Sequence, residues 1–189
     1  MRLPTEEEVV ALAHVAERGV HPPEFMPFRV PWTDGIGSDG FVESFLAFHL
    51  GLRRDWRPDS WYLELGVFSE DRIIGAQNLN ARDFASKREV ESGSWLGRVH
   101  QGHGLGTEMR AAVLTLAFDG LGAEAAVSGF VDGNAGSARV SEKLGYEIAG
   151  ESTLPDGRRE TTVRLERGDW RGPRAELDGL EPCLPLFGR

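Results

Sequence analysis

The segment from Trp95 to Thr107 has the residue types and the spacing of a loop that binds an anion. Glycines stand at 102, 104 and 106, between a strand-like segment and an amphipathic segment. Glycine has no Cβ, so the backbone can approach a ligand closely at such positions. The first turn of a following helix exposes unpaired N–H groups and the positive end of the helix dipole. These features predict a cradle for a pyrophosphate. The alternative is a tight strand-to-helix turn that binds nothing.

The glycine spacing argues against two common phosphate-binding motifs. Dinucleotide-binding folds use G-x-G-x-x-G with an acid about 20 residues further on, whereas this loop reads G-x-G-x-G. A P-loop places Lys directly after its last glycine, and no Lys follows Gly106. The loop therefore does not support chemistry with NAD, ATP or GTP.

Hydrophobic periodicity predicts the elements that position this loop. Thr5 and Glu8 form a capping box for the first helix, and Ser38 or Asp39 is expected to cap the second. The chain is expected to form helices at about 5–18, 39–52, 104–121 and 135–144, and strands at about 61–67, 73–80, 90–96, 125–131, 146–151 and 159–166. An antiparallel hairpin before a βαβ unit requires a mixed sheet. We therefore predict a three-layer α/β domain with a mostly antiparallel sheet flanked by helices.

Composition narrows the class of protein further. The chain has 189 residues, 40% hydrophobic and 27% charged, which is typical of one globular domain. A net charge of −9 disfavours a nucleic-acid partner. No apolar run is long enough to cross a membrane, and a cytoplasmic location is expected. The single cysteine, Cys183, excludes an internal disulfide, and the five histidines lack metal-ligand spacing, so no metal is expected.

Two motifs resemble those of a known family. Gln101-x-x-Gly104-x-Gly106 is similar to the [QR]-x-x-G-x-[GA] signature of the GNAT superfamily of acyl-CoA-dependent N-acyltransferases. The segment from Asn134 to Tyr146 resembles the N-x-x-S-x-x-V-x-E-K-L-G-[FY] block of its RimJ/RimL-type branch, which includes ribosomal-protein N-terminal acetyltransferases. With the order of elements, the resemblance covers residues 3–167. The family begins with a strand, for which only residues 1–3 are available, so a shortened or missing first strand is expected.

The resemblance implies an N-acyltransferase that moves an acyl group, with acetyl expected, from acetyl-CoA or another acyl-CoA to a primary amine by direct attack. The expected acceptor is a protein N-terminus. One alternative is a small-molecule amine such as an antibiotic or a polyamine, or the use of succinyl-CoA. An alternative of another class is a non-catalytic module that binds acyl-CoA.

The resemblance also implies which residues contact CoA. In the family, the strand before the loop splays from its neighbour and its free backbone pairs with the pantetheine arm. An N–H near Leu96 would bind the carbonyl oxygen. The expected CoA-binding residues are Trp95, Leu96, Gly97, Gln101, Gly102, His103, Gly104, Leu105, Gly106, Thr107, Asn134 and Ser137. Asn134 and Ser137 are also expected to cap the helix that they begin.

Two residues are candidates for the chemistry of transfer. Glu91 aligns with the acid of an E-x-G-x-W-L pattern common in this branch, and it is the expected base that deprotonates the amine. The alternatives are a solvated strand charge at Glu91 and a base role for Glu64 on the neighbouring strand. Ser141 stands where other members have a Tyr that protonates the thiolate, and its hydroxyl could hydrogen-bond the sulfur. The alternative is a serine on the helix surface.

The remaining predictions concern the acceptor and the C-terminal segment. Phe25, Phe28 and Trp32 lie where the family builds the wall of its acceptor site, although core packing would also explain them. The catalytic domain is expected to span 1–170 and a tail 171–189. The apolar end at 184–187 is expected to dock on its own domain or on a second copy, and a homodimer is the favoured prediction.

Overall fold

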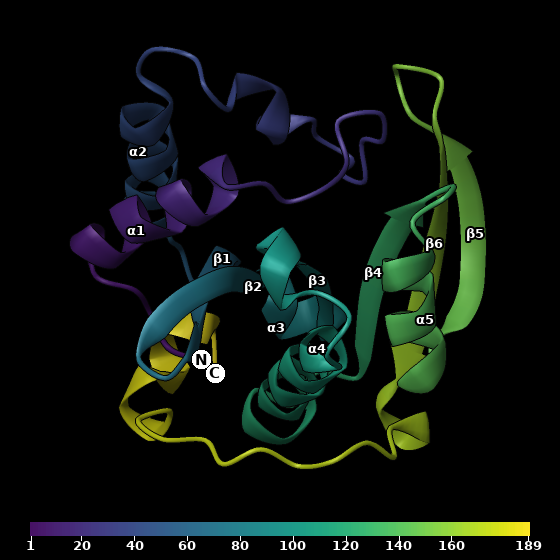
Figure 1. The fold of residues 1–189 in the computed structure, drawn as a ribbon. Coiled ribbons are helices and arrows are strands. Elements are labelled where there is room, and N and C mark those ends of the chain that lie inside the picture. Colours follow the sequence, from purple (N-terminus) through teal and green to yellow (C-terminus); the bar gives the residue numbers. More distant parts are fainter.

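Six strands form one sheet in the computed structural model, which describes residues 1–189. The order across the sheet is β1-β2-β3-β4-β6-β5, and only β3 and β4 run parallel (Figure 1). The strands are β1 (Ser60–Ser69), β2 (Arg72–Arg82), β3 (Glu89–Leu96), β4 (Ala125–Val131), β5 (Glu147–Thr153) and β6 (Arg159–Glu166). The predicted mixed, mostly antiparallel α/β fold is confirmed.

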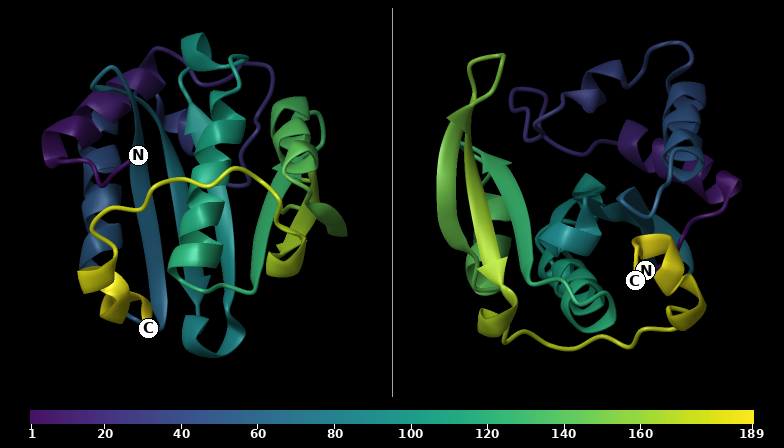
Figure 2. Two further views of the ribbon diagram at one scale, coloured as in Figure 1. Left: turned by 90° about the horizontal axis from the view of Figure 1, so that it is seen from below. Right: turned by 180° about the vertical axis from the view of Figure 1, so that it is seen from behind.

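Helices cover both faces of the sheet (Figures 1 and 2). One face carries α1 (Glu6–Glu17) and α2 (Phe41–Arg54), and the other carries α3 (Phe84–Lys87), α4 (Leu105–Thr115) and α5 (Ala135–Lys143). Short helical turns complete the chain: η1 (Trp32–Gly35), η2 (Arg98–His100), η3 (Leu116–Gly120), η4 (Arg167–Asp169) and η5 (Glu181–Phe187). None of these helices combines the length and the apolar character that a membrane crossing requires.

Alternation along the strands sends successive side chains to the two faces of the sheet, and each face carries an apolar cluster. Leu63, Leu79 and Val90 point to the α4 side and join the main core of the molecule. Their neighbours in sequence point to the α1–α2 side, where Glu64 and Glu91 lie. Because successive strand residues face opposite sides, the apolar pattern that fixes the core also places these carboxylates together on one face.

The predicted N-terminal cap is present in α1 but not in α2. In α1 the capping box is present, since the N–H of Glu8 donates to Thr5 Oγ1 at 3.2 Å and the N–H of Thr5 donates to Glu8 Oε2 at 2.8 Å. The predicted cap of α2 by Ser38 or Asp39 is wrong, because Gly40 takes that position with φ +80° and no side chain caps the helix. The α3 turn was not predicted from the sequence.

A single backbone bridge replaces the expected first strand. The N–H of Arg2 donates to the carbonyl of Gly66 at 3.3 Å, and the N–H of Gly66 donates back to the carbonyl of Arg2 at 2.9 Å. The backbone edge of β1 is therefore paired with the N-terminal residues at one point only, and the shortened first strand is confirmed.

The C-terminal segment folds back onto the same domain. After Trp170 it crosses α4, where the N–H of Ala175 donates to Thr115 Oγ1 at 3.2 Å (Figure 2). Its end reaches the β1 edge, where the ring centroid of Phe187 lies 5.0 Å from that of Trp61. The Phe187 side chain is 5% exposed. The apolar end thus packs in the core of its own domain, and the homodimer stays a prediction.

Replacing Phe187 with Ala is expected to destabilise the whole domain. Removing a buried Phe side chain costs about 3 kcal/mol or more of unfolding free energy. In a chain of this size that loss lowers the Tm by roughly 6–12 °C. Leu186→Ala is the matched control, since Leu186 is 53% exposed. Equal melting temperatures of the two variants in a calorimetric scan would show that the segment is not part of the core.

Candidate functional site

The glycine loop presents a row of free backbone donors. Gly102 and Gly104 have φ values of +81° and +84°, and a Cβ at either position would meet no atom within 4 Å. The N–H groups of residues 102–106 donate to no acceptor in the protein. The first helical bonds run from the N–H groups of Thr107 and Glu108 to the carbonyl of Gly104, at 3.0 and 3.2 Å. The loop and the start of α4 therefore offer consecutive donors, and the positive helix dipole, to one anion.

The side chain of Gln101 holds this loop against the rest of the domain. Its Nε2 donates to the carbonyls of Val20 at 2.7 Å and of Leu96 at 2.8 Å. It thus ties the segment after α1 to the end of β3. Its backbone N–H donates to the carbonyl of Arg98 at 3.2 Å, so both the side-chain and the backbone donors of Gln101 are used by the fold.

The parallel ladder between β3 and β4 stops early, beside the loop. We call the unpaired region between the two strands, beyond Glu91 and Val127, the wedge. The ladder consists of three pairs, from Glu89 with Ala125 to Glu91 with Val127. Although β3 continues to Leu96, no further pair joins it to β4, and Figure 1 shows the two strands diverging. The hydroxyl of Ser128 makes the last link, donating to the carbonyl of Ser92 at 2.8 Å. The unpaired edge of β3 is therefore followed in the chain, after residues 97–101, by the free donors of the loop.

Two carboxylates lie on the face of the sheet that α1 and α2 cover. In register, Asn78 faces both Glu64 and Gly93, and Asn80 pairs with Glu91. Glu64 is half-buried, no protein donor contacts it, and burial raises the pKa of its carboxyl to about 8. The Glu91 side chain is 47% exposed, and its carboxylate lies 3.4 Å from Nη1 of Arg29.

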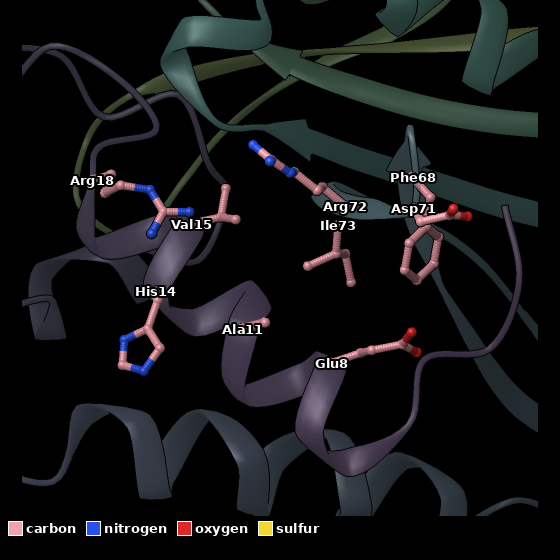
Figure 3. A pocket seen from close by; sticks show the side chains of 9 residues that line it. All are labelled: Glu8, Ala11, His14, Val15, Arg18, Phe68, Asp71, Arg72 and Ile73. Atoms are coloured by element: carbon pink, nitrogen blue, oxygen red, sulfur yellow. The ribbon is translucent and has the colours of Figure 1, made fainter.

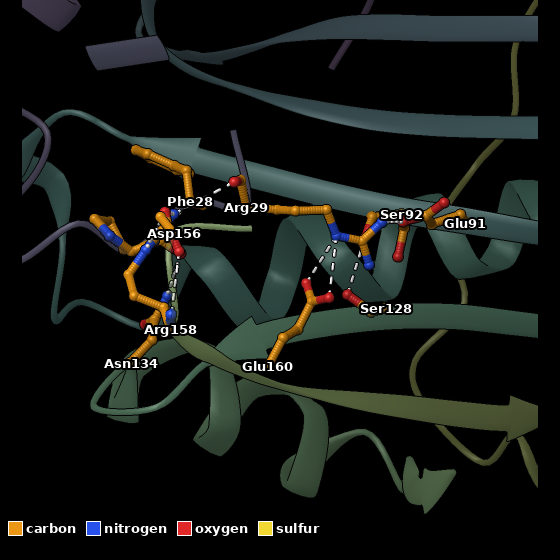
Figure 4. A network of polar contacts seen from close by, with 10 residues as sticks. Phe28, Arg29, Glu91, Ser92, Ser128, Asn134, Asp156, Arg158 and Glu160 are labelled. Atoms are coloured by element: carbon orange, nitrogen blue, oxygen red, sulfur yellow. Dashed lines mark hydrogen bonds and ion pairs between the residues drawn. The ribbon is translucent and has the colours of Figure 1, made fainter. Parts of the chain in front are cut away.

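Arg29 crosses the wedge on this same face (Figure 4). Its Nε donates to both carboxylate oxygens of Glu160 on β6, at 2.9 and 3.1 Å, while Nη1 reaches Glu91 on β3. The hydrogen bond from its guanidinium to Glu160 raises the pKa of Arg29. The Arg158 guanidinium holds the loop that carries Arg29, donating to the carbonyls of Met26 at 2.8 Å and Phe28 at 2.7 Å. Sequence reasoning missed Arg29, Glu160 and Arg158, because only the fold brings them together.

The predicted acceptor wall is divided between two places. The Trp32 ring lies 5.2 Å from those of both Phe28 and Trp95, measured between centroids. Phe28 and Trp32 therefore border the end of β3. Phe25 instead packs over Gly133 in the turn between β4 and α5.

The residues of the second motif act first on their own helix. Asn134 Oδ1 accepts a hydrogen bond from the N–H of Ser137 at 3.1 Å and so caps α5, as the sequence predicts. Ser141 is 2% exposed and its Oγ has no hydrogen-bond partner. The alternative of a surface serine is therefore wrong.

His103, in the glycine loop, is exposed.

A cavity of about 370 Å³ lies elsewhere, between α1 and the β1–β2 hairpin (Figure 3). It is lined by Glu8, Ala11, His14, Val15, Arg18, Phe68, Asp71, Arg72 and Ile73. None of these is a predicted site residue, so the cavity is separate from the loop and the wedge.

No group of three or more His, Cys, Asp or Glu side chains is arranged to hold a metal ion.

Free N–H groups at a helix start, beside a wedge between two strands, form an arrangement that suits an extended ligand with an anionic end. The sequence matches the family described as Acetyltransferase (GNAT) domain over residues 1–147. The chain belongs to this family and is an N-acetyltransferase, as the two motifs predict.

Solved structures share this fold at low sequence identity. RimL, a ribosomal L7/L12 alpha-N-protein acetyltransferase solved with coenzyme A, is 16% identical, with a TM-score of 0.69 over 87% of this chain and 92% of that chain. Mycobacterium smegmatis RimJ, solved with CoA-disulfide, is 17% identical, with a TM-score of 0.69 over 87% of this chain and 80% of that one. The yncA protein of Salmonella typhimurium, solved with acetyl-CoA, is 17% identical, with a TM-score of 0.61 over 93% and 97% of the two chains.

Replacing Gly104 with Val is expected to raise the Kd for CoA about tenfold or more, because a β-branched side chain is strained at positive φ and would distort the donor row. Gly157→Val is the matched control, since Gly157 has φ +86° in equally open space, in the turn between β5 and β6. Calorimetric titration with CoA measures both variants. Equal Kd values for folded Gly104→Val and wild type would remove the loop from CoA binding.

The stability of the protein is expected to fall as pH rises toward 8, because of Glu64. Burial raises the pKa of this carboxyl from its ordinary value of 4.5 to about 8. Between these values the native state holds a proton that the unfolded chain releases, so unfolding becomes more favourable as pH rises. Glu64→Gln should remove this dependence, and Glu147→Gln, at an exposed β5 position, should keep it. Parallel Tm curves for wild type and Glu64→Gln from pH 5 to 8 would contradict the assignment.

Proposed function

We propose that this protein transfers an acetyl group from acetyl-CoA to the α-amine of a protein N-terminus. One observation carries the proposal: the loop that follows β3 has free N–H groups at residues 102–106, and β3 itself is unpaired with β4 beyond Glu91. That arrangement fits a ligand with a pyrophosphate at one end and an amide-bearing arm, which is the chemistry of CoA. The RimL and RimJ neighbours favour a protein N-terminus as acceptor.

The chain's own groups fit the parts of CoA in order along β3. The N–H groups of residues 102–106 would bind the pyrophosphate, and the pantetheine arm would lie along the edge of β3 that faces β4, near Trp95–Gly97. The carbonyls of Ser92 and Leu96 both accept from partners outside β2, so their edge of the strand faces the wedge. The N–H of Leu96 lies on the same edge. It would donate to the thioester oxygen and stabilise the charge that develops there.

We assign removal of the amine proton to Glu91. Glu91 is on β3, the strand that borders the wedge, and its carboxylate is accessible. Glu64 lies two strands away on β1, and with a pKa of about 8 its carboxyl is mostly protonated at neutral pH. An α-amine has a pKa near ~8, so removing its proton at neutral pH requires little free energy. The incoming amine would compete with Arg29 for Glu91.

In the transfer itself the amine nitrogen attacks the thioester carbon, an amide bond forms and the C–S bond breaks. The departing thiolate has a pKa near ~8.5, so it leaves without strong acid help. The buried Ser141 hydroxyl has no acceptor in the protein and would donate to the sulfur. Asn134 and Ser137 at the start of α5 would contact the CoA arm from the other side of the wedge.

The acceptor is best identified by mass spectrometry of acyl transfer from acetyl-CoA to N-terminal peptides, polyamines and aminoglycosides. Transfer to peptide α-amines is the expected result. Transfer only to polyamines or aminoglycosides would show that the acceptor is a small-molecule amine and not a protein N-terminus. Binding of CoA without transfer to any amine would make the protein a non-catalytic module. The cytoplasmic location and the homodimer remain predictions.

Glu91→Gln is expected to lower kcat/KM at pH 7 by about tenfold or more. The lower limit is below the ~100-fold that a general base typically contributes, because an α-amine needs little help to lose its proton. The loss should shrink as pH rises, because free amine then forms without help. The Kd for CoA should stay within about twofold, since the carboxylate faces the acceptor side of the sheet and not the loop.

Glu64→Gln is the matched comparison, on the same face of the sheet. At pH 7 it exchanges one mostly neutral side chain for another, so kcat/KM should change little. A pH-rate profile of both variants decides the roles. A large loss in Glu64→Gln with wild-type rates in Glu91→Gln would transfer the base role to Glu64.

A further inference from the structure

A buried arginine spans the wedge without a negative partner. Arg110 of α4 is 3% exposed. Its Nη1 donates to Ser128 Oγ at 2.8 Å and its Nη2 to Ser94 Oγ at 3.3 Å, while its Nε has no partner. No carboxylate forms an ion pair with it. A buried charge without a counter-ion is costly, because hydroxyl groups replace only part of its hydration.

The position of this guanidinium is set by both diverging strands. Ser94 belongs to β3 and Ser128 to β4, so Arg110 lies where the ladder has just ended. The Oγ of Ser92, one residue beyond the last paired position, is also buried and without a partner. These four residues form a polar cluster at the closed end of the wedge, on the α4 side of the sheet. Glu91 and Arg29 lie on the opposite side.

An acyl chain bound in the proposed way would point toward this cluster. The pantetheine arm enters from the loop, the carbonyl lies at Leu96, and the chain continues in the direction of Ser94. Two strand residues span about 7 Å. An acetyl group ends after one carbon–carbon bond of about 1.5 Å, whereas a four-carbon chain has three such bonds and extends much closer to Arg110. A chain that ends in a carboxylate would supply the missing counter-ion and accept from Nε and Nη2.

We propose that Arg110, Ser92, Ser94 and Ser128 form a subsite for the terminal carboxylate of an acyl group, and that the enzyme accepts a dicarboxylic acyl-CoA of the succinyl type. The inference rests on the proposed function and deepens it. The reaction is unchanged: the amide bond forms, the C–S bond breaks, and the distal carboxylate takes no part.

The test compares acyl-CoA ligands of equal chain length by calorimetric titration. Wild-type protein should bind succinyl-CoA at least about tenfold more tightly than butyryl-CoA, since an ion pair to a buried charge is lost with the neutral chain. Arg110→Met should abolish this ratio, and Arg110→Lys should retain part of it. Arg54→Met removes an exposed arginine of α2 and should leave the ratio unchanged.

Equal affinity of the wild type for the two ligands would overturn the subsite, and so would a ratio that persists in Arg110→Met. If Arg110→Met does not fold, Ser94→Val serves as the second variant and should reduce the ratio. Acetyl transfer with equal succinyl and butyryl affinity would reject the subsite and leave the proposed function intact. Absence of CoA binding to wild-type protein would reject both.

Discussion

The end of the β3–β4 ladder after three pairs is the constraint on which the rest of the site depends. Two neighbouring strands in the middle of a sheet normally satisfy each other's N–H and C=O groups, and leaving them unpaired is costly unless other partners are found. Here side chains supply part of what is missing: Ser128 reaches the carbonyl of Ser92, and Gln101 reaches that of Leu96. The remaining backbone groups are left for an extended ligand that can pair like a strand. The glycine loop is useful only because it stands at the mouth of this opening.

The wedge also separates two kinds of charge onto opposite sides of the sheet. On the α1–α2 side lie the carboxylates of Glu91 and Glu160, with Arg29 between them. On the α4 side lies the guanidinium of Arg110, among hydroxyl groups alone. Under the proposed function, the amine would approach from the first side and the acyl chain would extend to the second. The two clusters share no side chain, so we expect acceptor and acyl selectivity to change independently.

Much of this arrangement could be predicted from local sequence. Alternation of apolar residues in 61–67 and 90–96 indicated strands whose faces are now clear, and the glycine spacing at 102–106 indicated the loop, because these patterns depend on near neighbours. The long-range contacts could not be predicted. Glu160 lies 131 residues from Arg29, and nothing in either neighbourhood indicates that they meet. Ser141 shows the same limit: its helix looks amphipathic, but only the packing of α5 shows that its hydroxyl is buried. The cap of α2 failed because a glycine at positive φ replaced the polar side chain that the sequence offered.

The C-terminal segment that crosses α4 packs against one end of this helix and so affects the position of the other end. The η3 turn directly follows α4. There Arg174 pairs with Asp119, and a Cβ on Gly120 would lie 2.6 Å from Leu180, so the crossing is tightly packed. The opposite end of the same helix carries the free N–H groups of the loop. An eleven-residue helix is about 16 Å long, so a tilt of about 4° at the packed end displaces the first turn by about 1 Å. Misplacement of that size can cost a catalyst about 100-fold in rate. Substitutions in the C-terminal segment, on the side of the molecule away from the glycine loop, are therefore expected to affect the rate through the position of α4.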